Sequence, residues 1–297
     1  MANTHFGNLA DVFKHLALGE ALGVMRPLEY WESHAGNACY EEIDAIPPER
    51  LHGIHTFHRL CGVSDVLRQS VYGGILGNPD VPLARIPGSP LLARRVLGEN
   101  VRRLLLCDTD AESLLNVRTH LLAAGSGLRE IPSDTLECVQ DDGVTVLRGA
   151  GMLLPEPWVA STLAFIDPYD MGGASDAEIS PLELACELAS RGIATLLFYT
   201  FADEARRAGQ RERIRQALSK ARLQARSVPG FEGSLKIPAS GDVPTQWGFG
   251  LLALNLSGAA AAMDQKLAAL EKLYERSELP MPGGTASGAW RYARAAW

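Results

Sequence analysis

Short apolar runs alternate with helical stretches along most of the chain beyond Ser89, and this alternation constrains the fold more than any other feature. The run at 162–166, Thr-Leu-Ala-Phe-Ile, is typical of a strand covered on both faces of a parallel sheet. Strands separated by helices in this way predict an α/β fold with a doubly wound, mostly parallel sheet. The predicted strands are 103–107, 136–139, 162–166, 193–199, "SLKIPA" and "FGLLALNL", and the predicted helices are 110–124, 176–190, 204–225 and 259–274.

The N-terminal part of the chain adds a helix and a short strand before this pattern. Apolar residues recur there at intervals of three and four, which is the spacing of one helix face: Leu9, Val12, Phe13 and Leu16. We therefore predict an amphipathic helix over 7–24, with Lys14 and His15 beside its buried stripe. A strand is predicted over 28–33.

A loosely patterned segment rich in His, Gly and Pro separates these elements from the rest of the chain. It predicts a small helical insertion over 41–86, with its main helix at 51–67, inside a single domain that spans 1–297. A further helix begins at Pro90, because proline suits the first position of a helix. The tail, 281–297, is predicted to be a loop with aromatic anchors.

The composition indicates a cytoplasmic protein. No apolar run approaches the roughly 18 residues of a membrane span, and the N-terminus lacks the cationic and apolar segments of a secretory signal. The five cysteines are scattered and form no C-x-x-C pair, so neither disulfides nor a cysteine zinc site is predicted. We expect no membrane partner. Whether the chain dimerises is left open, with a monomer as the expectation.

The formal net charge of −7 argues weakly against a protein that grips nucleic acid over its whole surface. Two local basic segments are still compatible with phosphate contacts. One contains Arg94, Arg95, Arg102 and Arg103, and the other contains Arg206, Arg207, Arg211, Arg213, Arg215, Lys220, Arg222 and Arg226. Solvated helix faces are the simpler explanation of both segments.

An acid, a proline and an aromatic residue follow strand 162–166 in the sequence "FIDPYDMGG". Ligands of open α/β sheets bind beyond the carboxyl ends of the strands, so Asp167 is a candidate site residue from its position alone. A strand-ending turn would explain the same Asp-Pro pair without any function. Asp170 could add a second carboxylate for a metal ion, although no third ligand is apparent.

Several motifs of the chain together resemble one enzyme family. They are "HFGNLADVFKH" at the N-terminus, "ESHAGNACY" after the first strand, "PGSPLLAR" at the start of a helix, and the strand ends "LLLCDTD", "CVQDDG" and "FIDPYD". Their order and spacing are similar to those of the RlmJ family, bacterial 23S ribosomal RNA adenine-N6 methyltransferases that use S-adenosylmethionine. The resemblance covers nearly the whole chain and implies a Rossmann-like class I methyltransferase fold with a small helical insertion.

The resemblance also implies roles for particular residues. Those expected to bind S-adenosylmethionine are Lys14, His15, His34, Gly36, Ser89, Asp108, Asp142, Gly143 and Asp167. Ser89 and Lys14 are expected near the cofactor carboxylate. Asp108 is expected at the ribose, and Asp142 with Gly143 at the adenine.

The expected catalytic motif consists of Asp167, Pro168 and Tyr169, and it departs from the family pattern. In Asp-Pro-Pro-Tyr, the carboxylate and a proline carbonyl accept the two amino hydrogens, and the aromatic ring stacks on the flipped base. This chain lacks one proline, so Tyr169 follows one residue early.

A second departure affects the expected ribose ligand. The family acid at the end of strand 103–107 aligns with Cys107, so Asp108 takes that role only after a shift of one residue, and Asp110 is the fallback. The second glycine of the "HAGNACY" loop is Ala38, a small change unless the position requires positive φ.

The expected function is methyl transfer to an exocyclic amino group, most simply adenine N6 of 23S ribosomal RNA. The shortened motif and the acidic balance leave two alternatives, methylation of a small molecule or peptide and a non-catalytic relative that binds RNA or protein. A metal site is not expected, since His52, His55 and His58 share a helix face without an acid or cysteine nearby. Tyr72 and Trp158 are expected to pack in the core or at its rim rather than to stack on a base.

Overall fold

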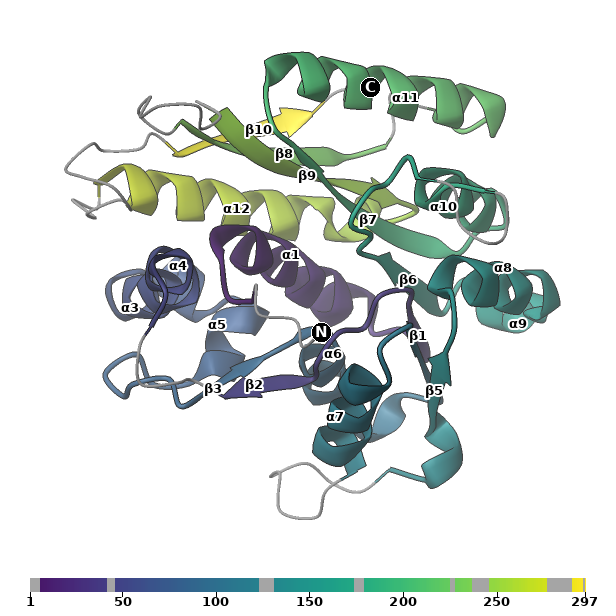
Figure 1. Ribbon diagram of the computed structural model, residues 1–297, viewed down its shortest axis with the longest axis horizontal. Coiled ribbons are helices and arrows are strands. Elements are labelled where there is room, and N and C mark those ends of the chain that lie inside the picture. Colours follow the sequence, from purple (N-terminus) through teal and green to yellow (C-terminus); the bar gives the residue numbers. More distant parts are fainter. Residues whose placement is uncertain are drawn as a thin grey trace.

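An eight-stranded sheet with helices against both faces forms the centre of the molecule (Figure 1). A second sheet of two strands lies beside it. The computed structural model describes residues 6–41, 46–122, 131–173, 179–224, 228–236, 246–276, 290–295 and 297. None of the helices within these ranges is both long and apolar enough to cross a membrane.

The strands of the large sheet follow the order β10-β8-β9-β7-β6-β1-β4-β5. The strands from β5 to β7 in this order run parallel, whereas β9, β8 and β10 pair antiparallel at one edge. The predicted mostly parallel sheet is therefore confirmed. The strands are β1 (Glu29–Glu32), β4 (Arg103–Asp108), β5 (Leu136–Gln140), β6 (Thr162–Ile166), β7 (Ala194–Phe201), β8 (Gly230–Lys236), β9 (Gln246–Leu254) and β10 (Trp290–Ala295).

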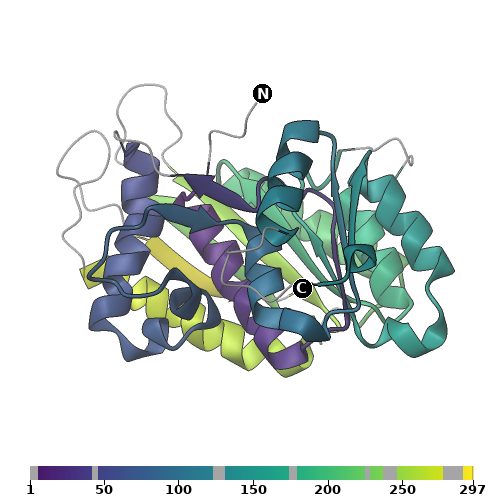
Figure 2. The same ribbon diagram turned by 90° about the horizontal axis from the view of Figure 1, so that it is seen from below.

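Two groups of helices bury the two faces of this sheet. One group is α1 (Leu9–Met25), α6 (Ser89–Leu97), α7 (Ala111–Leu122) and α12 (Ser257–Arg276), and the other is α8 (Gly143–Leu153), α9 (Glu156–Val159), α10 (Pro181–Ser190) and α11 (Glu204–Lys220). Figure 2 shows α1 and α12 on one side of the sheet and α8 and α10 on the other. Each group encloses its own hydrophobic cluster.

Strand β6 is buried on both faces of the sheet, which explains why the sequence at 162–166 is an uninterrupted apolar run. Its side chains alternate between the two clusters, because successive residues of a strand point to opposite faces of the sheet. Leu163 and Phe165 lie in the cluster with α1, and Ala164 and Ile166 lie in the cluster with α10. All positions of the strand are buried, as the sequence predicted.

The insertion contains short helices and is closed by the two-stranded sheet. β2 (Cys39–Glu41) pairs antiparallel with β3 (Arg85–Pro87), a pairing that no sequence pattern predicted. Between them lie α2 (Pro48–Arg50), the π-helix η1 (Leu51–His55), α3 (Thr56–Val63), α4 (Asp65–Arg68) and α5 (Val71–Leu76).

The prediction of one helix over 51–67 is wrong. Gly53 departs from helical geometry, with φ −86° and ψ −107°. Ser64 is extended and ends α3, and its side chain accepts a hydrogen bond from the Leu67 backbone N–H at the start of α4. A serine cap thus divides what the apolar pattern joined.

The tail contains a strand rather than only a loop, so this prediction also needs correction. β10 pairs antiparallel with β8 at the sheet edge. The Tyr292 backbone N–H donates to Glu271 at 2.8 Å and its hydroxyl donates to Asp264, both on α12. These partners lie far away in the sequence, which explains why local pattern did not reveal the strand. Predicted segments at 123–124, 176–178, 225, 237–239 and 281–289 lie outside the described residues.

A buried carboxylate on β8 connects β7 and α11. Glu232 is 1% exposed and accepts hydrogen bonds from the Tyr199 hydroxyl at 2.8 Å and from Arg207 Nε at 2.7 Å, and Arg211 also donates to it. Burial alone would raise the pKa of Glu232, but the hydrogen bonds from Arg211, Tyr199 and Arg207 outweigh it and lower the pKa. Part of the arginine-rich segment therefore has a structural role.

We expect Glu232→Ala to lower the free energy of unfolding by about 3 kcal/mol, because two arginines lose their buried partner. Urea denaturation at pH 7 measures this loss. The control is Glu212→Ala, which removes an exposed ion pair with Arg215 and should cost under about 1 kcal/mol. Equal losses in the two variants would contradict the structural role.

The same carboxylate predicts a pH dependence. Its pKa in the folded protein lies below the ordinary value of 4.5, so its stabilising contribution is complete above that pH and is lost as the pH falls through the folded-state pKa. The stability difference between wild type and Glu232→Ala should therefore shrink in acid below pH 4.5, as denaturation at a series of pH values would measure.

Candidate functional site

Polar side chains converge at the carboxyl ends of β1 and β6. The chain continues from β1 into Ser33 and His34, and from β6 into Asp167. β1 pairs with β4 on one side and with β6 on the other, so the strand order reverses at this point of the sheet. Open α/β sheets bind ligands at such a switch point.

A small cavity of about 70 Å³ lies at this edge. It is bounded by α1, the loop after β1, the start of α6 and the end of β6. Six residues that the sequence analysis assigned to the cofactor line it: Lys14, His15, His34, Gly36, Ser89 and Asp167. The structure therefore brings these residues together, while their role in cofactor binding stays a prediction.

A wide groove of about 1160 Å³ adjoins the small cavity. Asp167, Pro168 and Tyr169 all line the groove, and the Tyr169 side chain is fully exposed there. The residues common to the groove and the small cavity are Asp11, Lys14, His34 and Asp167. We call these four residues the shared edge.

Lys14 connects two carboxylates of the shared edge. Its Nζ lies 2.7 Å from Asp167 Oδ2 and 2.8 Å from Asp11 Oδ1, and the three side chains are 13–15% exposed. Burial would lower the pKa of Lys14, but the charges of Asp11 and Asp167 outweigh it and raise the pKa well above its ordinary value. Lys14 therefore stays a cation and holds Asp167 in place.

Both predicted histidines are neutral at physiological pH. Burial and the charge of Lys14 lower the pKa of His15 to about 3, and its ring packs edge-on against Tyr72 at 5.4 Å. Its Nδ1 is buried and has no hydrogen-bond partner among the described residues. Burial also lowers the pKa of His34, against the opposing charges of Asp167, Asp108 and Asp142, and its Nδ1 lies 2.7 Å from the Ser33 hydroxyl.

Ser89 is engaged by a buried acid that the sequence analysis missed. Its hydroxyl donates to Glu32, which also accepts a hydrogen bond from the Tyr30 hydroxyl at 3.0 Å. Burial raises the pKa of Glu32 well above its ordinary value. Toward a ligand, the start of α6 offers the N–H groups of Ser89 and Leu91, since Pro90 has none and the Leu92 N–H is bonded to the Gly88 carbonyl at 3.0 Å.

Asp108, and not Cys107, contacts the loop that lines the small cavity. Cys107 is fully buried in the cluster with Trp31 and Leu105. The Asp108 carboxylate accepts hydrogen bonds from the Gly36 N–H at 2.8 Å and from the Asp110 N–H at 2.8 Å. Asp108 therefore contacts the loop that lines the small cavity, although it lines neither the small cavity nor the wide groove itself, and its role at the ribose stays a prediction.

Asp110, the alternative candidate for the ribose ligand, caps helix α7. Its carboxylate accepts hydrogen bonds from the Glu112 N–H at 3.2 Å and from the Ser113 hydroxyl at 3.0 Å. These contacts cap the start of α7, and Asp110 lines neither the small cavity nor the wide groove.

Asp142 and Gly143 lie at the start of α8, outside the small cavity. Asp142 caps this helix and accepts hydrogen bonds from the Val144 and Thr145 N–H groups at 3.3 and 3.1 Å. Gly143 packs so closely on the end of β1 that an added Cβ would lie 1.9 Å from the Ser33 carbonyl oxygen. The glycine is thus required for the approach of α8 to β1.

The remaining candidates have structural contacts. Asp170 accepts a hydrogen bond from the Gly172 N–H at 2.9 Å, and no group of three metal-ligating side chains occurs among the residues that the structure describes. Tyr72 is 1% exposed and stacks on Phe57, although its edge also lines the small cavity. Trp158 packs under Arg102 at 3.9 Å.

Sequence reasoning missed residues that complete the small cavity. Asp11 precedes Lys14 by three residues on α1, a spacing that places ion-pair partners on one helix face and could have identified it. Phe6 and Tyr40 also line the cavity, and their rings stack at 4.2 Å. No local pattern joins two rings from such distant segments.

These features define an α/β protein with a polar site at the switch point of its sheet. No family model and no curated protein matches the chain. The fold is similar to that of protein LPL1258 from Legionella pneumophila str. Philadelphia 1 (family-model DUF519), with 20% sequence identity, a TM-score of 0.69 and 98% of each chain covered. This likeness extends over the insertion and shows the fold alone.

A second solved structure, precorrin 8w decarboxylase from Methanobacterium thermoautotrophicum, is 14% identical over 56% of this chain and 76% of that one. Its TM-score of 0.33 is too low to support any argument. The resemblance to the RlmJ family stays a prediction.

We expect Lys14→Met to raise the pKa of Asp11, because the main cation that offsets the burial of this carboxyl is removed. The variant should also lose about 3 kcal/mol of stability at pH 7, since two partly buried carboxylates remain without their cation. A ¹³C NMR titration of the aspartate carboxyl carbons measures the pKa, and urea denaturation measures the stability.

The matched control is Lys220→Met, which removes a largely exposed ion pair with Glu183. It should leave the Asp11 titration unchanged and cost little stability. An unchanged Asp11 titration in Lys14→Met would refute the assigned role of Lys14.

Proposed function

We propose that the protein is an S-adenosylmethionine-dependent methyltransferase that acts on an exocyclic amino group, most simply adenine N6 of 23S ribosomal RNA. One observation carries this proposal. Asp167 lies on the shared edge between a small polar cavity and a wide groove, so a methyl donor in the first can meet an acceptor in the second.

The residues of the small cavity fit the charged end of the cofactor. Lys14 and the start of α6 suit a carboxylate, whereas Asp11 and Asp167 suit the positively charged amino group. The unpartnered Nδ1 of buried His15 gives one further polar contact. Bound there, S-adenosylmethionine would supply an electrophilic methyl group on its sulfonium.

The size of the cavity limits what it holds. Its volume of about 70 Å³ is well below the roughly 300–1,000 Å³ of most small-molecule sites, so it admits only one end of such a cofactor. Asp108 adjoins its lining through Gly36, and Asp142 with Gly143 lies at the next strand end. In this proposal they bind the ribose and the adenine.

In this proposal Asp167 orients the methyl acceptor and Tyr169 stacks on it. Asp167 Oδ2 is held by Lys14, which leaves Oδ1 to accept an amino N–H and to orient the nitrogen lone pair. The carboxylate then takes up the proton that the nitrogen loses on methylation. The exposed ring of Tyr169 offers a stacking surface for a base out of its helix.

Cations along the wide groove favour a nucleic acid as acceptor. Arg206 and Arg213 on α11 line it, and no ion pair involves either arginine within the described part of the chain. Arg207 and Arg211, by contrast, are bound to Glu232. Two such arginines provide local phosphate contacts despite the overall net charge of −7.

The purified protein is expected to transfer a labelled methyl group from S-adenosylmethionine to deproteinised 23S ribosomal RNA. Asp167→Asn should lower kcat by about 10²–10³-fold, because the acceptor loses its orienting carboxylate. Asp65→Asn, at an exposed acid of α4, is the matched control and should leave the rate unchanged.

Incorporation into a metabolite extract instead of RNA would replace the RNA acceptor with a small molecule. A folded protein that gives no calorimetric signal with S-adenosylmethionine would refute the proposed enzyme activity. Full activity of Asp167→Asn would remove Asp167 from the mechanism.

A double variant tests the groove separately. Arg206→Gln with Arg213→Gln should weaken RNA binding and make the slope of log K against log salt shallower by about 1.4, the value for two lost single-strand phosphate contacts. Fluorescence anisotropy at a series of salt concentrations measures the slope. Arg215→Gln lies on the same helix outside the groove lining and should leave the slope unchanged.

A further inference from the structure

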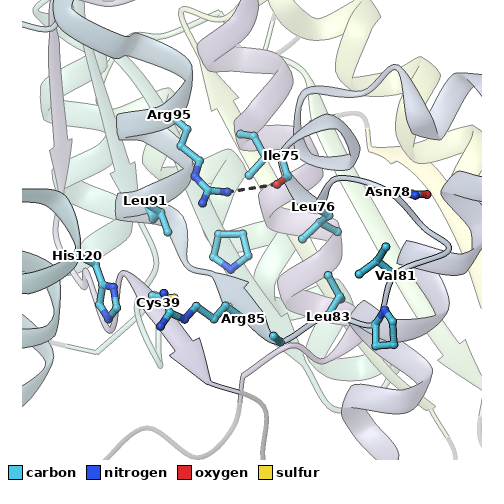
Figure 3. A pocket seen from close by; sticks show the side chains of 13 residues that line it. Cys39, Ile75, Leu76, Asn78, Val81, Leu83, Arg85, Leu91, Arg95 and His120 are labelled. Atoms are coloured by element: carbon cyan, nitrogen blue, oxygen red, sulfur yellow. Dashed lines mark hydrogen bonds between the residues drawn. The ribbon is translucent and has the colours of Figure 1, made fainter. Parts of the chain in front are cut away.

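A second cavity, which we call the insertion cavity, has a volume of about 420 Å³. It lies between the insertion and helices α6 and α7, and it is lined by residues of α5, of the segment leading into β3, and of β3 itself (Figure 3). Its volume falls within the roughly 300–1,000 Å³ of typical small-molecule sites. Nothing in the proposed methyl transfer uses it.

The two-stranded sheet separates this cavity from the small cavity. Tyr40 and Ile86 are paired across β2 and β3 and line the small cavity. Cys39 and Arg85 belong to the neighbouring positions of the two strands and line the insertion cavity. Because successive strand residues point to opposite faces, the sheet forms a wall between two distinct sites.

One side of the insertion cavity carries cationic and hydrogen-bonding groups. Arg85, Arg95 and His120 lie there, opposite Leu76 and Leu83 (Figure 3). The two arginines come from different elements, β3 and α6, and His120 comes from α7. An anionic group would therefore meet donors from three directions.

Partners among the described residues leave most of these donors available. Arg85 lies 3.7 Å from Glu41, but the side chains are 65% and 73% exposed, so this ion pair is weak. Arg95 donates one N–H to the Ile75 carbonyl at 3.2 Å, and a guanidinium has five such donors. Burial and the charge of Arg85 lower the pKa of His120, which leaves a neutral ring that can donate.

The other side of the cavity is aliphatic. Leu76, Val81 and Leu83 line it (Figure 3), and no Phe, Tyr or Trp side chain occurs among the described residues that line the cavity. We propose that the insertion cavity binds a small amphipathic anion, a carboxylate or phosphate group carried on an aliphatic body. The charged group contacts Arg85, Arg95 and His120, and the body packs on the leucines.

Octanoate and octyl phosphate are suitable probes, because they share the aliphatic body and differ in the anionic group. Isothermal titration of the full chain without S-adenosylmethionine should show saturable binding of at least one of them at one site. Octyltrimethylammonium, with the same body and the opposite charge, should not bind. Inorganic phosphate should bind more weakly than octyl phosphate, since it lacks the apolar contacts.

Arg85→Gln and Arg95→Gln should each weaken binding by about tenfold, the loss of one charge-assisted hydrogen bond. Leu83→Asp should abolish binding of the anions by placing a like charge at the aliphatic side. Arg68→Gln, an exposed change on α4 outside the cavity lining, is the control and should bind normally.

Several results would overturn the proposal: no saturable binding of either anion, equal binding of the cationic analogue, or unchanged affinity in the folded Arg85→Gln/Arg95→Gln double variant. Circular dichroism confirms that the variants are folded. Because no methyl donor is present, the result is independent of the proposed methyltransferase activity.

Discussion

The ion pair between Lys14 and Asp167 connects the N-terminal helix to the end of a central strand, and the geometry of the candidate site depends on it. Lys14 Nζ lies within 2.8 Å of both Asp11 and Asp167, and all three side chains are largely covered. Burying two carboxylates is costly unless a cation compensates them. The lysine thus allows negative charge to persist at the edge that the small cavity and the wide groove share.

Other buried acids connect elements in the same way. Glu32 at the end of β1 accepts a hydrogen bond from Ser89, which fixes the start of α6 beside the small cavity. Glu232 on β8 binds Arg207 and Arg211 of α11. The helix that contributes cations to the wide groove is therefore anchored to the sheet by neighbouring arginines on the same helix. Buried polar groups and their partners thus fix the positions of α6 beside the small cavity and of α11 beside the wide groove.

The insertion gives the molecule a second cavity on the far side of the two-stranded sheet from the small cavity. The pairing of β2 with β3 closes the insertion at its base, and the alternation of side chains directs Tyr40 toward one cavity and Cys39 toward the other. Pro87 lines both cavities, immediately before the Gly88–Ser89 start of α6. The short sheet therefore separates two cavities whose linings have only Pro87 in common among the described residues.

The sequence by itself determined the parallel strands, the helical span of α1 and the position of Asp167, because apolar periodicity and strand ends are local properties of the chain. The predicted one-sided burial of α1 is wrong, because α5, α6, α12, η1 and β9 surround the helix and bury nearly every residue from Leu9 to Leu22. Only the tertiary structure decided that Asp108 contacts the Gly36 loop while Cys107 enters the core, that Asp11 joins Lys14 and Asp167, and that the tail forms β10. Lys14 and Asp167 are 153 residues apart, and no local period encodes a contact over that separation. Such contacts arise when the sheet brings distant strand ends to one edge, where burial makes an uncompensated charge costly.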